Sequence, residues 1–204
     1  MTPTQTQWSP SEGAVSPMEG VPYRSLLGCL QYIANRCRPD TSYQVAVLSQ
    51  FCERHGPEHW KSLIKILMYL ASTKNLGLRF ILSKPPLQMT VFVDASWASN
   101  PDDRKSWTAY SLFLNGIPIT WRVVKQSCVT LSPMEAEFIA ASEAVKELKF
   151  LKACLDEISV VLNFKEIPVV IQRAILMCDN TAAIHFIKNK AENIRKCHID
   201  MKYK

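Results

Sequence analysis

The stretch Met89 to Trp97, MTVFVDASW, is the part of the sequence that decides the fold. Val91, Phe92 and Val93 favour a β-strand with at least one buried face, and Asp94 follows where the chain turns polar. An acid in this place has two interpretations. Either it starts a turn by accepting nearby backbone N–H groups, or it belongs to a site at the end of the strand.

Three later acids stand in comparable contexts, namely Glu137, Asp179 and Asp200. Asp179 ends a second apolar strand, Ala174 to Cys178, and Asn180 can cap the helix that follows. A strand-to-helix junction of this kind places the carboxylate at the carboxyl edge of a sheet, where open α/β folds bind their ligands. The presence of these three further acids favours the interpretation of Asp94 as part of a site.

The long helix that carries Glu137 has a clear start in Ser132-Pro133-Met134-Glu135 and is expected to run to about Glu157. Ser132 can cap the helix, and Glu135 can reach back as the acid of a capping box. Glu137 lies about 200° from Glu135 around the helix, beside an apolar stripe. The alternative for Glu137 is a solvated first-turn acid favoured by the helix dipole. The stripe consists of Phe138, Ala141, Val145 and Leu148.

A β-hairpin is predicted from Ala109 to Val124, because Asn115-Gly116 separates two β-prone runs and both residues tolerate the positive φ of a type I′ turn. Gln126 to Leu131 is a candidate for a further strand of the same sheet. Strands followed by helices make this half of the chain an α/β domain.

The first half of the chain is predicted to be helical. Apolar spacing predicts one helix over Tyr23 to Arg36. Asp40 is expected to cap a second helix that runs to about Cys52, and Gly56-Pro57 opens a third. Leu76 to Leu82 is a candidate strand before the Pro85-Pro86 joint.

Composition excludes several classes of protein. The 204 residues are 48% hydrophobic and 21% charged, enough for a folded core, and no run is long and apolar enough to cross a membrane. The net charge of +6 favours an anionic partner such as nucleic acid. Seven cysteines without a C-x-x-C pair argue against a disulfide framework and against structural zinc. His55 and His59 straddle the Gly56-Pro57 break and are interpreted as surface residues.

Carboxylates that converge at one edge repel one another unless cations neutralise them. Their hard oxygen atoms suit Mg²⁺ or Mn²⁺, and two such ions form a clamp for phosphodiester displacement. The four acids therefore suggest a two-metal site.

Four strings of this chain carry a family resemblance: VFVDASWASNPDDRKSWTAYSLFL, ITWRVVKQSCVTLSPMEAEFIAASEA, MCDNTAAI and KCHIDMKYK. In order, spacing and content they resemble the ribonuclease H domain of copia-type retrotransposon Pol polyproteins. The helical half, with VPYRSLLGCLQYIANRCRPDTSYQVAVLSQF, resembles the segment that joins reverse transcriptase to that domain.

The resemblance implies an α/β fold, a ribonuclease H-like mixed sheet flanked by helices and preceded by a small helical segment. Its domains would be a flexible 1–20, a thumb or connection-like 21–84 and a ribonuclease H-like 87–204. Asp94, Glu137, Asp179 and Asp200 would be the catalytic acids and would bind two Mg²⁺ or Mn²⁺ ions. The expected activity is cleavage of the RNA strand of an RNA–DNA hybrid, in the cytoplasm or nucleus.

The chain departs from the family pattern near its end. The family continues for a helix beyond the last acid, whereas this chain stops four residues after Asp200. We therefore expect a truncated last helix, which would hold Asp200 poorly and could leave the domain inactive.

Two alternatives to the enzyme follow. The first is a basic nucleic-acid-binding module without turnover. The second is a secreted effector acting on host proteins inside host cells, since such fragments also resemble oomycete effectors. Arg24-Ser25-Leu26-Leu27 approaches the Arg-x-Leu-Arg translocation pattern but lacks its final Arg, and no signal peptide precedes it.

Overall fold

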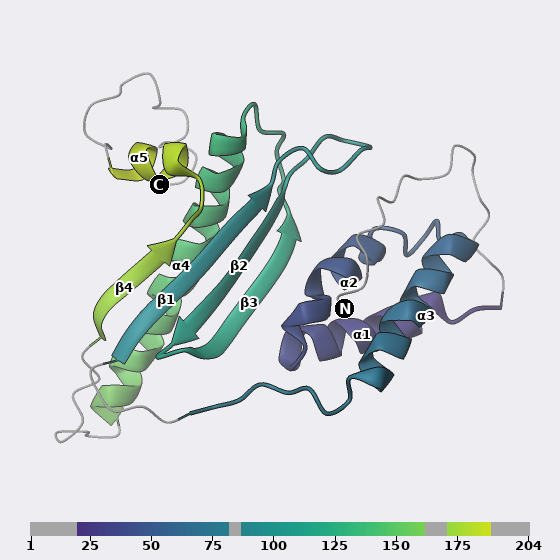
Figure 1. The fold of residues 1–204 in the computed structure, drawn as a ribbon, viewed down its shortest axis with the longest axis horizontal. Helices are drawn as coiled ribbons and strands as arrows, with labels where there is room; N and C mark the ends of the chain where they lie inside the picture. Colours follow the sequence, from purple (N-terminus) through teal and green to yellow (C-terminus); the bar gives the residue numbers. More distant parts are fainter. Residues whose placement is uncertain (1–19, 82–86, 162–170, 189–204) are drawn as a thin grey trace. The chain divides into compact units, whose positions relative to one another are not determined.

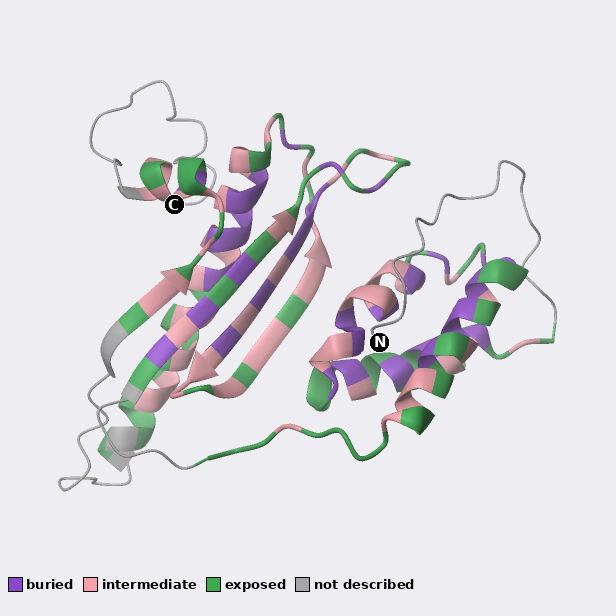
Figure 2. Cartoon of the chain, viewed as in Figure 1, coloured by how far each residue is buried: buried purple, intermediate pink, exposed green. Residues whose placement is uncertain are grey.

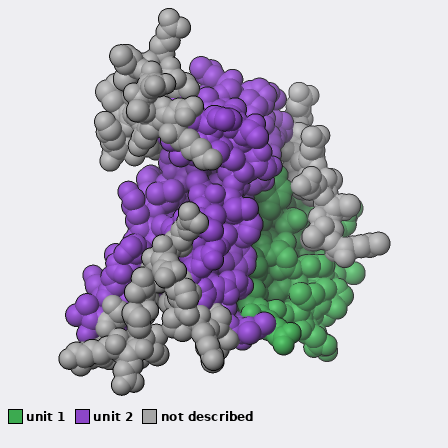
Figure 3. Space-filling model, turned by 60° about the vertical axis from the view of Figure 1, so that its left-hand side comes forward, with its two compact units in different colours: residues 1–79 green, residues 80–204 purple. Residues whose placement is uncertain are grey.

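The computed structural model describes residues 20–81, 87–161 and 171–188 of the chain. The chain divides into two compact units, residues 1–79 and 80–204, which Figure 3 colours separately. The first unit is helical and the second contains the only sheet of the described ranges. Within those ranges, no helix has both the length and the apolar character needed to cross a membrane.

Three helices and one short 3-10 turn form the first unit. They are α1 (Tyr23–Arg36), η1 (Pro39–Thr41), α2 (Ser42–Ser49) and α3 (Pro57–Ser72). The first helix has the bounds that its apolar spacing predicts, and the third begins at Pro57 as expected.

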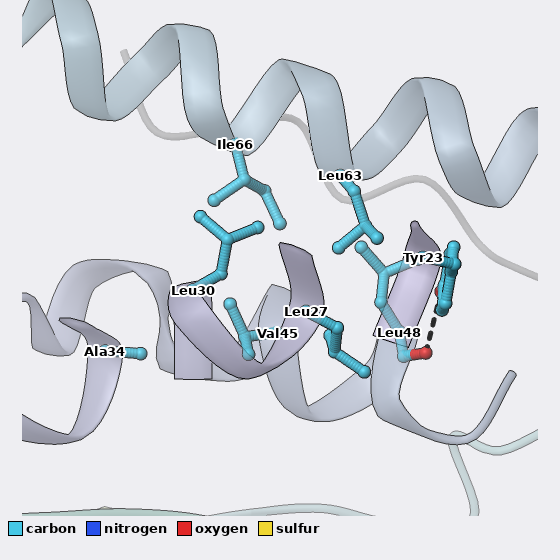
Figure 4. Packing of buried hydrophobic residues seen from close by; sticks show 8 residues of the cluster. All are labelled: Tyr23, Leu27, Leu30, Ala34, Val45, Leu48, Leu63 and Ile66. Atoms are coloured by element: carbon cyan, nitrogen blue, oxygen red, sulfur yellow. Dashed lines mark hydrogen bonds between the residues drawn. The ribbon is translucent and has the colours of Figure 1, made fainter. Parts of the chain in front are cut away.

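A compact apolar core joins these three helices (Figure 4). The Tyr23 hydroxyl donates to the backbone oxygen of Leu48 at 2.9 Å, so even the polar tip of this buried ring is satisfied. Side chains from all three helices therefore exclude water together. The core consists of Tyr23, Leu27, Leu30, Ala34, Val45, Leu48, Leu63 and Ile66.

Asp40 does not cap α2 as the sequence suggested. It lies in η1, and its two carboxylate oxygens accept Arg38 Nε at 3.0 Å and Arg38 Nη2 at 2.8 Å. Tyr69 also donates its hydroxyl to Asp40 at 2.8 Å. Arg38 is a buried guanidinium, and a buried charge requires a hydrogen-bonded partner, so the carboxylate is used there instead of at a helix end.

The surface interpretation of His55 and His59 is wrong, because both are buried. The ring of His55 stacks on Tyr23 with 4.3 Å between centroids, and that of His59 stacks on Phe51 with 4.0 Å. The Gly56 N–H donates to His59 Nδ1 at 2.9 Å. The Gly-Pro break thus starts a helix with one buried face, and the two imidazoles pack at this point as flat rings.

The second unit is built on a mixed sheet with the strand order β3-β2-β1-β4 (Figure 1). Its strands are β1 (Leu87–Ser96), β2 (Trp107–Leu114), β3 (Ile117–Lys125) and β4 (Ile171–Met177). β1 pairs antiparallel with β2 and parallel with β4, and β2 pairs antiparallel with β3. The α/β class expected from the sequence is confirmed.

The predicted hairpin is confirmed at the turn between β2 and β3. Asn115 has φ of 49° and Gly116 has φ of 80°, the positive values that a type I′ turn requires. Asn115 also ties the turn to the start of β1, because the Gln88 N–H donates to its Oδ1 at 2.6 Å.

Two expected strands are absent. Residues 126–131 form a loop and do not extend the sheet. The side chain of Gln126 is buried there, because its amide donates to Thr108 Oγ1 and to the backbone oxygen of Ala136, each at 3.0 Å. Residues 76–81, the described part of the other candidate, have no regular structure. Phe80 and Ile81 are exposed there, so no neighbouring surface supports a strand.

Helix α4 (Pro133–Val161) covers one face of the sheet and contacts β1 and β2 (Figure 1). Burial alternates along β1, where Val91 and Val93 face the core while Phe92 is exposed (Figure 2). The buried face of α4 is turned slightly from the expected stripe and consists mainly of alanines, together with Ile139 and Glu137. Phe138 packs edge-on against Phe186 of α5 (Thr181–Lys188). Those alanines are Ala136, Ala140, Ala141 and Ala144.

Replacing Gly116 by Ala tests the hairpin. No atom lies within 4 Å of the added Cβ, so only backbone strain at positive φ opposes the change. We expect the free energy of unfolding to fall by about 1–2 kcal/mol. Urea unfolding followed by circular dichroism measures this. Gly77→Ala is the matched control, since its Cβ also meets nothing within 4 Å and its φ is not positive; equal effects of the two changes would contradict the assignment.

Candidate functional site

The parallel pairing of β1 and β4 brings two acids to one edge of the sheet. Phe92 of β1 is the register partner of Met177 of β4. Asp94 and Asp179 each lie two residues beyond this pair, so they are at equivalent positions along two neighbouring segments of the same sheet. Parallel strands lie about 4.8 Å apart, which keeps these backbones close.

Helix α4 brings a third acid to the same edge. Its start is fixed as the sequence predicts, with the Glu135 N–H donating to Ser132 Oγ at 3.2 Å. Glu135 itself accepts the Leu131 N–H at 2.8 Å, so this acid has a structural role at the helix end. Glu137, two residues further on, is turned inward and is only 5% exposed.

Glu137 is held by the end of β1. The backbone N–H of Ala95 donates to Glu137 Oε1 at 3.2 Å. The thiol of Cys178 approaches Glu137 Oε2, with the sulfur 3.8 Å from the oxygen. The interpretation of Glu137 as a solvated first-turn acid is therefore wrong.

Among the described residues, Glu137, Cys178 and Asp179 form a group of potential metal ligands. One ligand atom from each lies within 4.8 Å of the other two. Asp94 is not part of this group; it is exposed, and strand alternation directs it away from the face that carries Val93. It is nevertheless close enough to act on Glu137 electrostatically.

The pKa of Glu137 is raised, first by burial and then by the charges of Asp94 and Asp179. The Ala95 N–H and the Cys178 thiol oppose this rise by stabilising the carboxylate. Burial also raises the pKa of Cys178, as do the two neighbouring carboxylates. Among the ion pairs of the described residues, none includes Asp94, Glu137 or Asp179, so no basic side chain of the described ranges pairs with the group.

Of the four acids singled out in the sequence, the structure brings Glu137 and Asp179 together, and Asp94 lies near enough to act on Glu137 electrostatically. Asp200, the fourth, lies outside the described residues. Cys178 was missed as a member of the site, although its position directly before Asp179 was a usable signal. The Ala95 amide could not be found from sequence, since it contributes only backbone.

The donor set suits divalent cations. Carboxylate oxygens are hard ligands of the kind that Mg²⁺ and Mn²⁺ prefer, and their uncompensated charge favours a cation at this edge. Among the described side chains, Glu137 and Asp179 lie close enough together to hold such an ion, and Asp94 is near enough to act on Glu137 electrostatically.

Comparison with known proteins shows that this chain is similar in sequence to retrotransposon Pol polyproteins. It is 40% identical over 186 residues to the retrovirus-related Pol polyprotein from transposon TNT 1-94 of Nicotiana tabacum. It is 33% identical over 181 residues to that from transposon RE2 of Arabidopsis thaliana. These matches cover 91% and 89% of the chain but only 13% and 12% of the polyproteins.

A third relative is covered almost completely. Secreted RxLR effector protein 161 of Plasmopara viticola is 40% identical over 134 residues, which are 66% of this chain and 94% of that protein. No protein-family model matches the chain. No solved structure matches it either.

Fold and site together define an α/β protein whose mixed sheet carries an acidic cluster at one edge. The relatives make the identification more specific. The chain belongs to a family of retrotransposon Pol-derived sequences that includes copia-type Pol polyproteins and an oomycete RxLR effector.

The raised pKa of Glu137 predicts a pH effect on stability when divalent cations are removed by a chelator. At a pH above the pKa of Glu137 in the unfolded chain, about 4.3, Glu137 keeps its proton in the folded chain but has lost it in the unfolded chain. The contribution of Glu137 to stability is therefore present below that pH and is lost as pH rises through its folded pKa.

We expect the stability of the wild type relative to Glu137→Gln to fall as pH rises through this window. Urea unfolding of both proteins across a pH series measures the difference. A stability difference that stays constant with pH would show that Glu137 titrates normally.

Proposed function

We propose that residues 87–204 form a ribonuclease H-like nuclease domain that cuts the RNA strand of RNA–DNA hybrids. Asp94, Glu137 and Asp179 would hold two Mg²⁺ or Mn²⁺ ions, with Asp200 as the fourth acid. The family supports the proposal, because Pol polyproteins of retrotransposons are its relatives. The expected partner is nucleic acid, and the expected location is the cytoplasm or nucleus.

One observation carries this proposal, namely the meeting of Glu137 and Asp179 at the edge where Asp94 lies near the end of β1. Burying an acid beside two others is unfavourable, as the raised pKa of Glu137 records. A purely structural position would be more stable with an apolar side chain. The arrangement is therefore best explained by a cation that it is built to bind.

The described residues divide the work of the site. Glu137 is held in one orientation by the Ala95 N–H, and burial keeps bulk water from its carboxylate. Exposed Asp94 and Asp179 are the acids that an incoming phosphate backbone can reach. The bound ions would supply charge stabilisation and an activated water for phosphodiester hydrolysis.

Loss of Glu137 should abolish hybrid cleavage. Glu137→Gln removes one negative charge but keeps the shape of the side chain, and we expect at least about a hundredfold loss of rate. The measurement is Mg²⁺-dependent cleavage of a labelled RNA–DNA hybrid. Asp94→Asn should lose activity in the same way.

Glu135→Gln is the matched control, since this neighbouring acid caps the helix and Gln can accept the same N–H. It should retain most of the activity. Wild-type cleavage no greater than that of Asp94→Asn would refute the nuclease proposal. Salt-sensitive binding of the hybrid without cleavage would instead identify a nucleic-acid-binding module.

A second candidate function rests on the match over 94% of secreted RxLR effector protein 161. In this alternative, the chain would be secreted and would act on host proteins without catalysis. Arg24-Ser25-Leu26-Leu27 does not add support, because it lies within α1 and Leu27 is buried in the core of the first unit.

The effector alternative predicts that the protein is found outside the cell that produces it. Any effect on host cells should then be the same for the wild type and for Asp94→Asn, because no acid chemistry is needed. Immunodetection in the secreted fraction and a host-cell assay measure the two properties. Retention in the producing cell, or dependence of the effect on Asp94, would count against it.

A further inference from the structure

We propose that Cys178 is a metal ligand, and that with Glu137 and Asp179 it forms a site for one thiophilic divalent cation, Zn²⁺ or Cd²⁺. This inference rests on the proposed function in one respect only, since it concerns the same edge of the sheet. It assigns a second kind of cation to that edge, which binds the sulfur of Cys178, a ligand that Mg²⁺ or Mn²⁺ would not use.

The spacing of the three donors supports this assignment. Zinc binds sulfur at about 2.3 Å and carboxylate oxygen at about 2.0–2.2 Å, so adjacent ligand atoms in a tetrahedral site are roughly 3.5 Å apart. Cys178 Sγ already lies 3.8 Å from Glu137 Oε2. All three ligand atoms lie within 4.8 Å of one another, so small side-chain rotations suffice.

The surroundings of the thiol support it as well. Cys178 is half-buried and directly follows β4, and Asn180 caps the helix that comes next, with the Ala183 N–H donating to Asn180 Oδ1 at 2.9 Å. This short junction between two regular elements fixes Cys178 and Asp179 together. Glu137 is held by the hydrogen bond from the Ala95 N–H. The ligands are therefore held before a cation arrives.

The chemistry of the donor set separates the two kinds of cation. Mg²⁺ prefers oxygen ligands and would leave the sulfur unused, whereas Zn²⁺ and Cd²⁺ gain a strong bond from thiolate. When the metal–sulfur bond forms, the thiol releases its proton to solvent. Because Glu137 and Asp179 serve both occupants, a thiophilic cation would compete with Mg²⁺ and would inhibit the proposed cleavage.

Cadmium titration of the full-length reduced protein tests this site. Cadmium–thiolate bonds absorb in the ultraviolet, so the readout is spectroscopic and needs no nucleic acid. We expect one equivalent of Cd²⁺ to bind with such a band, and Zn²⁺ to displace it. Cys178→Ser should lose this band and weaken binding at least tenfold.

The other six cysteines require matched controls. Cys128→Ser changes a half-buried thiol of the same unit and should leave the band unchanged. Asp179→Asn changes an exposed side chain, so it leaves the packed core untouched, and it should weaken Cd²⁺ binding at least tenfold. Equal bands and affinities in the wild type, Cys178→Ser and Asp179→Asn would overturn the proposal.

The outcome can be separated from that of the proposed function. A protein that shows the Cys178-dependent band but never cleaves a hybrid would keep the metal site and lose the nuclease. A protein that cleaves with Mg²⁺ but shows no such band would keep the nuclease and overturn the role of Cys178.

Discussion

Close packing of α4 on the sheet is the constraint on which the second unit depends. Ala136, Ala140 and Ala144 recur at every fourth position and are fully buried. Their small side chains let the helix backbone approach β1, as larger side chains could not. That approach brings Glu137 within hydrogen-bonding distance of the Ala95 N–H, and thus joins the helix to the strand end that carries Asp94.

The same packing makes the candidate site electrostatically unfavourable. Glu137 is removed from water, and two further carboxylates stand near it without a basic partner in the described part of the chain. Elsewhere the protein treats buried charge differently. Buried Arg38 is paired with Asp40 at 2.8 Å, and Tyr69 supports the pair. The contrast between a satisfied ion pair and a cluster without a described basic partner is what marks the cluster as a candidate functional site.

The wrong predictions for His55, His59 and Gln126 have the same physical cause. Apolar periodicity does not reveal that His55 and His59 stack in a core, since an imidazole ring packs like a small aromatic once its surroundings are apolar. Nor does β-propensity reveal that Gln126 is buried as a link between β2 and α4. These outcomes depend on residues distant in the chain, and tertiary context overrides local preference.

The sequence by itself determined the features that local chemistry controls. These are the turn at Asn115-Gly116, where φ must be positive, and the start of α4 at Ser132-Pro133. Only the tertiary structure decided that Glu137 is buried and that Cys178 stands beside it. A turn or a cap involves neighbours in the chain, whereas a site needs segments some forty residues apart to meet, and their packing alone sets that geometry.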